Sequence, residues 1–173
     1  MYIIAEIGIN HNGSIGHAKK LIDLAHQARC HAVKFQKRDI ESVYSKEELD
    51  KYRESPWGTT NREQKEGLEF SIEQYKELYK YTKDLCMDFI VSCWDRKSIK
   101  LIEDNLDVDY HKVASASVTD KEFLDDLTNT GKPIILSTGM SSERQVDDAV
   151  NILSSNLEYI LACTSTYPSS IDE

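Results

Sequence analysis

Charged side chains that can do chemistry interrupt the short apolar runs of this chain. Glu6 stands in the first run, Lys34 in the second and Lys112 in the fourth. A carboxylate in such a run is costly to bury unless it is paired or takes part in chemistry, so Glu6 is a general acid/base candidate. Two inward ammonium groups form an anion site for phosphate or carboxylate. Two alternatives stay open: Glu6 forms an ion pair with Lys34 or Lys112, and either lysine extends to solvent from a strand end.

Neutral polar groups follow the same runs. Gln36 can add a hydrogen-bond donor beside Lys34, and the serines after the fourth and fifth runs can contact a phosphate together with the backbone amides of the Ser-Thr-Gly-Met segment. The hydroxyl residues at these two ends are Ser115, Ser117, Ser137 and Thr138. Gly139 most simply serves the turn, and Ser137 is the expected phosphate contact.

Histidines and cysteines give weaker indications. His11 lies in the Asn-His-Asn-Gly segment after the first run, where it either faces a substrate or serves a turn or cap. No histidine, cysteine or carboxylate spacing is that of a self-sufficient metal site, so the residues alone predict no metal. Cys93 and Cys163 have no assignable His or Asn partner and are read as small packing residues.

Six apolar runs, each ending in polar residues, have to position these groups. Segments with helical periodicity alternate with them, most clearly 71–86, which favours right-handed crossovers and a parallel sheet. Reacting groups at strand ends are typical of a closed βα barrel. The prediction is an α/β fold, a TIM-type barrel with about six βα units. A complete barrel needs about 250 residues, so the single domain 1–173 is expected to be incomplete.

The connection from Arg38 to Phe70 is longer than the others and holds Trp57 among many charges. Long connections in compact domains are usually functional or disordered. Two interpretations of this connection remain: a lid over the barrel mouth, or an excursion into solvent. Lys37 and Arg38, at its start, are expected to be solvated. Trp94 and Asp95 can line the mouth, although Asp95 alternatively only caps the following helix.

Composition limits the possible partners. The formal net charge of −9 argues against a broad nucleic-acid or anionic-membrane footprint, and no run is long enough to cross a bilayer. Four cysteines without Cys-x-x-Cys spacing, and no apolar leader, favour a cytoplasmic protein with free thiols. The chain ends just beyond the sixth run, which suggests a fragment of a longer product.

Several motifs together resemble the N-acetylneuraminate (sialic acid) synthase family, which includes synthases of related nonulosonic acids. The resemblance runs from Ile4 to Pro168. It rests on A-E-I-G-I-N-H-N-G, V-K-F-Q, the charged stretch before L-E-F, Y-H-K-V-A-S, G-K-P-I-I-L-S-T-G-M and C-T-S-T-Y-P, in this order. Each motif alone is unspecific, and the series is specific.

The resemblance implies an enzyme that condenses phosphoenolpyruvate with an N-acylated amino sugar, N-acetylmannosamine or a relative, and releases phosphate. It implies that a divalent metal, Mn or Mg, activates the sugar aldehyde, with ligands outside this chain. It also implies a homodimer and a C-terminal antifreeze-like domain, which is absent from this sequence. By position, phosphoenolpyruvate ligands are Lys34, Lys112, Ser115 and Ser137; sugar-side or loop contacts are Gln36 and Tyr167; and the acid/base is Glu6.

The chain departs from the family pattern at Cys93, Ser117 and Ser165, where members often carry Thr, an acidic residue and Asn. These departures bear on substrate identity more than on reaction type. Two other readings remain. A desolvated Lys112 can act as a Schiff-base nucleophile in an aldolase. A noncatalytic fragment can bind an anion or pair with another chain through an exposed strand edge.

Overall fold

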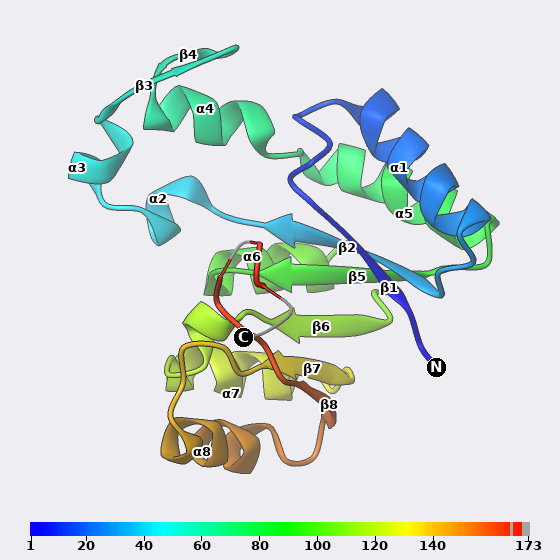
Figure 1. The fold of residues 1–173 in the computed structure, drawn as a ribbon, viewed down its shortest axis with the longest axis vertical. Helices are drawn as coiled ribbons and strands as arrows, with labels where there is room; N and C mark the ends of the chain where they lie inside the picture. Colours follow the sequence, from blue (N-terminus) through cyan, green and yellow to red (C-terminus); the bar gives the residue numbers. More distant parts are fainter. Residues whose placement is uncertain (167, 171–173) are drawn as a thin grey trace. The chain divides into compact units, whose positions relative to one another are not determined.

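The computed structural model describes residues 1–166 and 168–170. The chain divides into two compact units, Met1–Val108 and Asp109–Glu173. Both units alternate parallel strands with helices (Figure 1), as the sequence predicts. None of the helices in the described ranges is long and apolar enough to cross a membrane.

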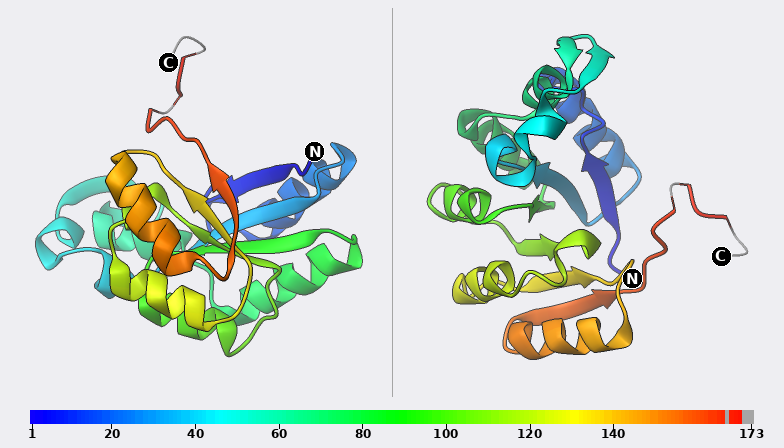
Figure 2. Two further views of the ribbon diagram at one scale, coloured as in Figure 1. Left: turned by 90° about the horizontal axis from the view of Figure 1, so that it is seen from below. Right: turned by 90° about the vertical axis from the view of Figure 1, so that its left-hand side faces the viewer.

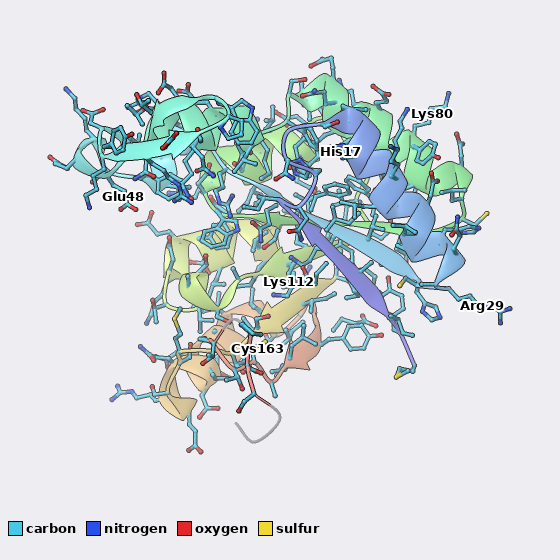
Figure 3. All side chains as sticks on the ribbon, turned by 45° about the horizontal axis from the view of Figure 1, so that its top comes forward. His17, Arg29, Glu48, Lys80, Lys112 and Cys163 are labelled. Carbon is cyan, nitrogen blue, oxygen red and sulfur yellow. The ribbon has the colours of Figure 1, made fainter. Side chains whose placement is uncertain are left out.

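The first unit is built on three parallel strands in the order β1-β2-β5, followed or preceded by helices that cover them. Its barrel-type elements are β1 (Ile4–Gly8), α1 (Ile15–Gln27), β2 (Ala32–Lys37), α5 (Ile72–Asp84), β5 (Asp88–Cys93) and α6 (Arg96–Glu103). α1 and α5 lie side by side along the sheet (Figure 1). Figure 3 labels His17 on α1 and Lys80 on α5, and both residues are exposed.

Alternation along β2 sorts its side chains onto two faces. Phe35 lies against Tyr75 of α5 with ring centroids 6.5 Å apart, and it stacks on Phe89 of β5 at 5.3 Å. The residues of odd number therefore face the helices. Lys34 and Gln36 point to the opposite face of the sheet, which is the interior of a barrel.

The excursion is the segment from Asp39 to Phe70, and it has secondary structure of its own. It extends beyond the carboxyl end of β2 (cyan to green in Figure 1). Its elements are α2 (Ile40–Val43), α3 (Lys46–Leu49), the antiparallel strands β3 (Tyr52–Ser55) and β4 (Gly58–Thr60), and α4 (Asn61–Leu68). It is therefore a folded segment rather than an irregular loop, and its role as a lid stays a prediction.

Close packing at two glycines holds the excursion against the loop after β1. A methyl group on Gly67 would lie 2.2 Å from the Trp57 ring, and one on Gly13 would lie 2.1 Å from the Gly67 carbonyl oxygen. Neither position leaves room for a side chain. Trp57 therefore packs directly on the α4 backbone.

Gly67→Ala is expected to destabilise the excursion. Overpacking costs about 1–3 kcal/mol, which exceeds the ~1 kcal/mol that alanine gains over glycine in a helix. Limited proteolysis within residues 39–66 should accelerate and Trp57 fluorescence should change. Gly16→Ala in α1 is the matched control, because its nearest atom would be 3.8 Å away. Equal protease resistance of the Gly67→Ala protein would contradict this account of the packing.

The second unit carries three parallel strands in the order β6-β7-β8. Its elements are β6 (Tyr110–Val113), the 3₁₀ turn η1 (Ser115–Ser117), α7 (Lys121–Asn129), β7 (Ile134–Ser137), α8 (Glu143–Leu153) and β8 (Leu157–Leu161). α7 and α8 pack side by side (Figure 2), and Thr128 Oγ1 donates to the Ile152 carbonyl between them at 3.4 Å. β7 is the central strand of the three and all its residues are buried.

Candidate active site

Glu6 and Lys34 form an ion pair across neighbouring strands. The β1–β2 register places them opposite each other, and Lys34 Nζ lies 2.8 Å from Glu6 Oε2. The Lys34 side chain is 5% exposed, whereas Glu6 is 58% exposed. The pairing expected as an alternative is thus confirmed for Lys34, but Glu6 is not the buried carboxylate that its apolar surroundings suggested. A carboxylate with one paired side and one open side can still exchange protons with a ligand.

Lys37 and Arg38 are buried, so their interpretation as solvated residues is wrong. They are 8% and 9% exposed, and both meet Glu69 at the end of the excursion. Lys37 Nζ lies 3.0 Å from Glu69 Oε2, and Arg38 Nη1 lies 3.6 Å from Glu69 Oε1. Buried cations require such a partner, and this one comes from more than thirty residues away in the chain.

Arg38 also contacts Gln36 and Trp94. Its Nη2 donates to Gln36 Oε1 at 2.5 Å, and its guanidinium lies 4.5 Å from the centre of the Trp94 ring. Trp94 is held in turn because its backbone amide donates to the Lys37 carbonyl at 3.0 Å. The sequence placed Gln36 and Trp94 near the mouth, and Arg38 is the residue that it missed. No local pattern indicates the burial of Arg38, because that burial depends on Glu69, which is distant in the sequence.

Asp95 joins the start of the excursion to α6. Asp95 Oδ1 accepts from the Ser98 amide at 2.8 Å, which confirms its helix-capping role. Asp95 Oδ2 accepts from the Asp39 amide at 2.8 Å. Asp39 itself binds Ser42 and Lys97, and its pKa is lowered, chiefly by the Ser42 hydroxyl hydrogen bond. The backbone that leaves β2 is therefore tied to the backbone that leaves β5.

His11 is a buried, neutral residue of the loop after β1. Its ring stacks on Phe70 with centroids 4.0 Å apart, and its Nδ1 accepts from the Gly13 amide at 3.1 Å. Burial lowers its pKa from 6.5 to about 4. Of the two roles left open by the sequence, the turn role is the one that these contacts describe. His11 fixes the loop that follows Glu6 against the end of the excursion.

Lowering the pH is expected to destabilise the protein through His11. The unfolded chain binds this proton below about pH 6.5 and the folded protein only near pH 4, so the free energy of unfolding falls as the pH drops through that window. Urea unfolding followed from about pH 7 to about pH 5 should show a shallower loss for His11→Gln than for the wild type. His17→Gln, at an exposed position, is the control and should follow the wild type. Identical pH dependence of all three proteins would contradict the assignment.

In the second unit, Lys112 and Ser137 form a buried pair at the ends of β6 and β7. Lys112 Nζ donates to Ser137 Oγ at 2.5 Å and to the Val113 carbonyl at 2.8 Å. The two residues are 5% and 6% exposed. Figure 3 labels Lys112 on β6 and Cys163 on the segment after β8. The charge and the hydroxyl that the sequence assigned to an anion are thus in direct contact.

Ser115 lies beside the turn that follows β7. Its Oγ accepts from the Gly139 amide at 3.0 Å, and a methyl group on Gly139 would lie 2.5 Å from Ser165 Oγ and 3.0 Å from Ser115 Oγ. Gly139 therefore serves the turn, as expected, and also permits the close approach of two hydroxyls. Tyr167 lies outside the described residues.

The two cysteines differ. Cys93 is buried, and burial raises its pKa, which fits its interpretation as a packing residue. Cys163 is exposed, so that interpretation is wrong for Cys163; its Sγ donates to the Leu161 carbonyl at 3.5 Å. No group of three or more His, Cys, Asp or Glu side chains within residues 1–166 and 168–170 could hold a metal ion. The donor set described here therefore does not fit a divalent metal.

The fold defines the class of this protein first. Its structure is similar to that of an N-acetylneuraminic acid (sialic acid) synthetase from Leptospira borgpetersenii serovar Hardjo-bovis, with a TM-score of 0.84 and 24% identity over 99% of this chain and 56% of that chain. At 24% identity, the structural similarity is evidence for the fold alone. The predicted α/β fold, an incomplete TIM-type barrel of parallel strands, is thereby confirmed.

The sequence then identifies the family. The model of the NeuB family matches residues 21–173, and the chain belongs to this family. It is 38% identical to N-acetylneuraminate-9-phosphate synthase of Drosophila melanogaster, over 97% of this chain and 46% of that protein. It is 32% identical to N,N'-diacetyllegionaminic acid synthase of Campylobacter jejuni, over 99% of this chain and 53% of that protein. The chain thus spans about half the length of these relatives.

Proposed function

We propose that the protein containing this chain condenses phosphoenolpyruvate with an N-acylated amino sugar to form a sialic or related nonulosonic acid, with release of phosphate. The observation that carries the proposal is the buried Lys112–Ser137 pair at the ends of β6 and β7. A buried ammonium beside a hydroxyl suits a phosphate ester. The NeuB family membership supports it, since the relatives are named as synthases of such acids.

The second unit supplies the proposed phosphoenolpyruvate contacts. Lys112 neutralises the phosphate charge, and Ser137 and Ser115 donate hydroxyl hydrogen bonds to its oxygens. The Ser115 oxygen accepts from the Gly139 amide through a lone pair, and its O–H is a separate group that can donate to a ligand. These groups favour the departure of phosphate when the carbon–oxygen bond breaks.

The first unit supplies the proposed acid/base and sugar contacts. Lys34 binds a carboxylate oxygen of phosphoenolpyruvate, and Glu6, paired with Lys34, moves a proton near the reacting carbons. In the condensation, carbon three of phosphoenolpyruvate attacks the sugar aldehyde, water adds at carbon two, and the tetrahedral product collapses with release of phosphate. Gln36 and Tyr167 contact the sugar or its loop in this proposal.

The proposal also includes a metal, a location, an oligomeric state and a further domain, none of which rests on the residues described above. A divalent metal, Mn or Mg, would polarise the sugar aldehyde, and its ligands would come from outside this chain. No step above is assigned to it. A cytoplasmic location and a homodimer completed by a C-terminal antifreeze-like domain belong to the same proposal.

A coupled assay on the complete gene product tests this function. Phosphate release should require both phosphoenolpyruvate and the amino sugar, offered free and as its phosphate monoester, and should fall on chelation of divalent metal. Phosphate release at the same rate without the sugar, or no phosphate release with any N-acylated amino sugar, would overturn the proposal.

The Schiff-base alternative makes a different prediction, and the relatives do not favour it. An aldolase that uses Lys112 would be trapped covalently by borohydride with pyruvate. We expect no such adduct. A Lys112 adduct found by mass spectrometry would replace the condensation with aldol chemistry.

A further inference from the structure

The carboxamide of Gln36 has a defined orientation. Its oxygen accepts from Arg38 Nη2 at 2.5 Å, and a methyl group on Gly8 would lie 3.7 Å from its nitrogen. A guanidinium only donates, so the atom facing it has to be the carbonyl oxygen. The amide NH₂ of Gln36 is thereby turned toward Gly8, at the carboxyl end of β1. Glu6 lies two residues before Gly8 on that strand, with an irregularity of the β1–β2 register between them.

Arg38 is held so that it cannot easily release Gln36. Its guanidinium lies over the Trp94 ring at 4.5 Å, and its Nη1 lies 3.6 Å from Glu69 Oε1. Arg38 is 9% exposed, and Glu69 also accepts from the Arg38 backbone amide at 3.2 Å. A buried side chain with a ring face, a carboxylate and an amide oxygen as partners has little rotamer freedom.

Two buried N–H groups beside Gln36 have hydrogen-bonding capacity to spare. Arg38 Nε and Trp94 Nε1 are both buried and have no hydrogen-bond partner among the described residues. The oxygen of Gln36 is turned to Arg38 and accepts from it. What this part of the site can offer to a ligand is therefore N–H groups, and a ligand atom that accepts hydrogen bonds would match it.

We propose that Arg38 is a positioning residue that makes Gln36 a hydrogen-bond donor to an acceptor oxygen of the amino sugar. The inference rests on the proposed function for the identity of the ligand. Arg38 acts through Gln36 and does not contact the sugar itself. The site consequently selects a carbonyl, aldehyde or hydroxyl oxygen at this position and discriminates against a group that can only donate.

Steady-state kinetics of the complete gene product test the proposal. Arg38→Leu lets the carboxamide rotate, so the KM for the amino sugar should rise about tenfold while the KM for phosphoenolpyruvate stays within about twofold. Arg38→Lys returns a donor and should recover part of the loss. Gln36→Glu keeps the contact with Arg38 but removes the NH₂, so it should weaken sugar binding at least as much. Arg62→Leu, in a half-exposed ion pair with Glu41 on the excursion, is the matched control and should behave as wild type.

Nitrogen-15 NMR separates this inference from the proposed function. The Gln36 NH₂ resonances, assigned by their loss in Gln36→Glu, should shift in Arg38→Leu without any ligand and return toward the wild-type position in Arg38→Lys. That readout does not need turnover. An inactive wild-type protein would therefore contradict the proposed function but not the role of Arg38. Unmoved resonances in Arg38→Leu, an unchanged sugar KM in an active Arg38→Leu protein, or an unaffected Gln36→Glu protein would overturn the role of Arg38. If Arg38→Leu does not fold, Arg38→Lys and Gln36→Glu decide the question by the same readouts.

Discussion

Lys112→Met is expected to raise the KM for phosphoenolpyruvate about 100-fold in the complete gene product. Lys112 is 5% exposed and its ammonium already donates to Ser137, so methionine fills the space but removes the charge. Hydrogen bonds to charged groups contribute about 1.5–3 kcal/mol, and the upper part of that range corresponds to about 100-fold. Isothermal titration with phosphoenolpyruvate alone measures the effect apart from turnover.

Two controls accompany the Lys112 variant. Lys121→Met removes an exposed ammonium from α7 in the same unit and should leave phosphoenolpyruvate affinity unchanged. Thermal unfolding shows whether Lys112→Met keeps the native fold. A folded Lys112→Met protein with wild-type affinity would remove Lys112 from the proposed phosphate site.

Glu6→Gln is expected to lower kcat by about 10²- to 10⁴-fold, the usual contribution of general acid/base catalysis. Glutamine has the same shape, and its side-chain oxygen can still accept from Lys34, which lies 2.8 Å from the Glu6 carboxylate in the wild type. Substrate binding should therefore change little, with either KM within about threefold. Single-turnover measurements with saturating substrates isolate the chemical step.

Glu54→Gln on β3 is the matched control for Glu6, because Glu54 is exposed and lies in the excursion. It should retain wild-type kcat. Wild-type turnover in Glu6→Gln would reduce Glu6 to a partner that holds Lys34 in place. A fall in affinity without a fall in kcat would point to the same structural role.

The six parallel strands could be predicted well from the sequence, whereas the exact first residues of α7 and α8 could not. Apolar runs located the strands because burial on both faces leaves little room for polar residues. Thr119 and Ser141 also have side chains that can cap a helix, but Asp120 and Ser142, each one residue later, cap α7 and α8. Adjacent residues here can all cap a helix, so only the backbone angles decide which one does.

The part of the candidate site on β2 could be predicted, because it depends only on the alternation of side chains along that strand. Lys34 and Gln36 share a face of β2 because side chains alternate, and that face is opposite the one occupied by Phe35. Arg38 continues this alternation, yet it was interpreted as solvated. Its burial depends on Glu69, which arrives from the far end of the excursion. Contacts between residues so distant in sequence leave no local pattern.

The sequence by itself determined which groups are available for chemistry: carboxylate, ammonium and hydroxyl groups in or just after the apolar runs of a chain that belongs to the NeuB family. Only the tertiary structure decided how those groups are paired. It set Glu6 against Lys34 through strand register and joined Lys112 to Ser137 across β6 and β7. It also oriented Gln36 through Arg38. The physical reason is that residue types and periodicity are local properties, whereas register, burial and hydrogen-bond direction are decided by segments that meet only in the folded chain.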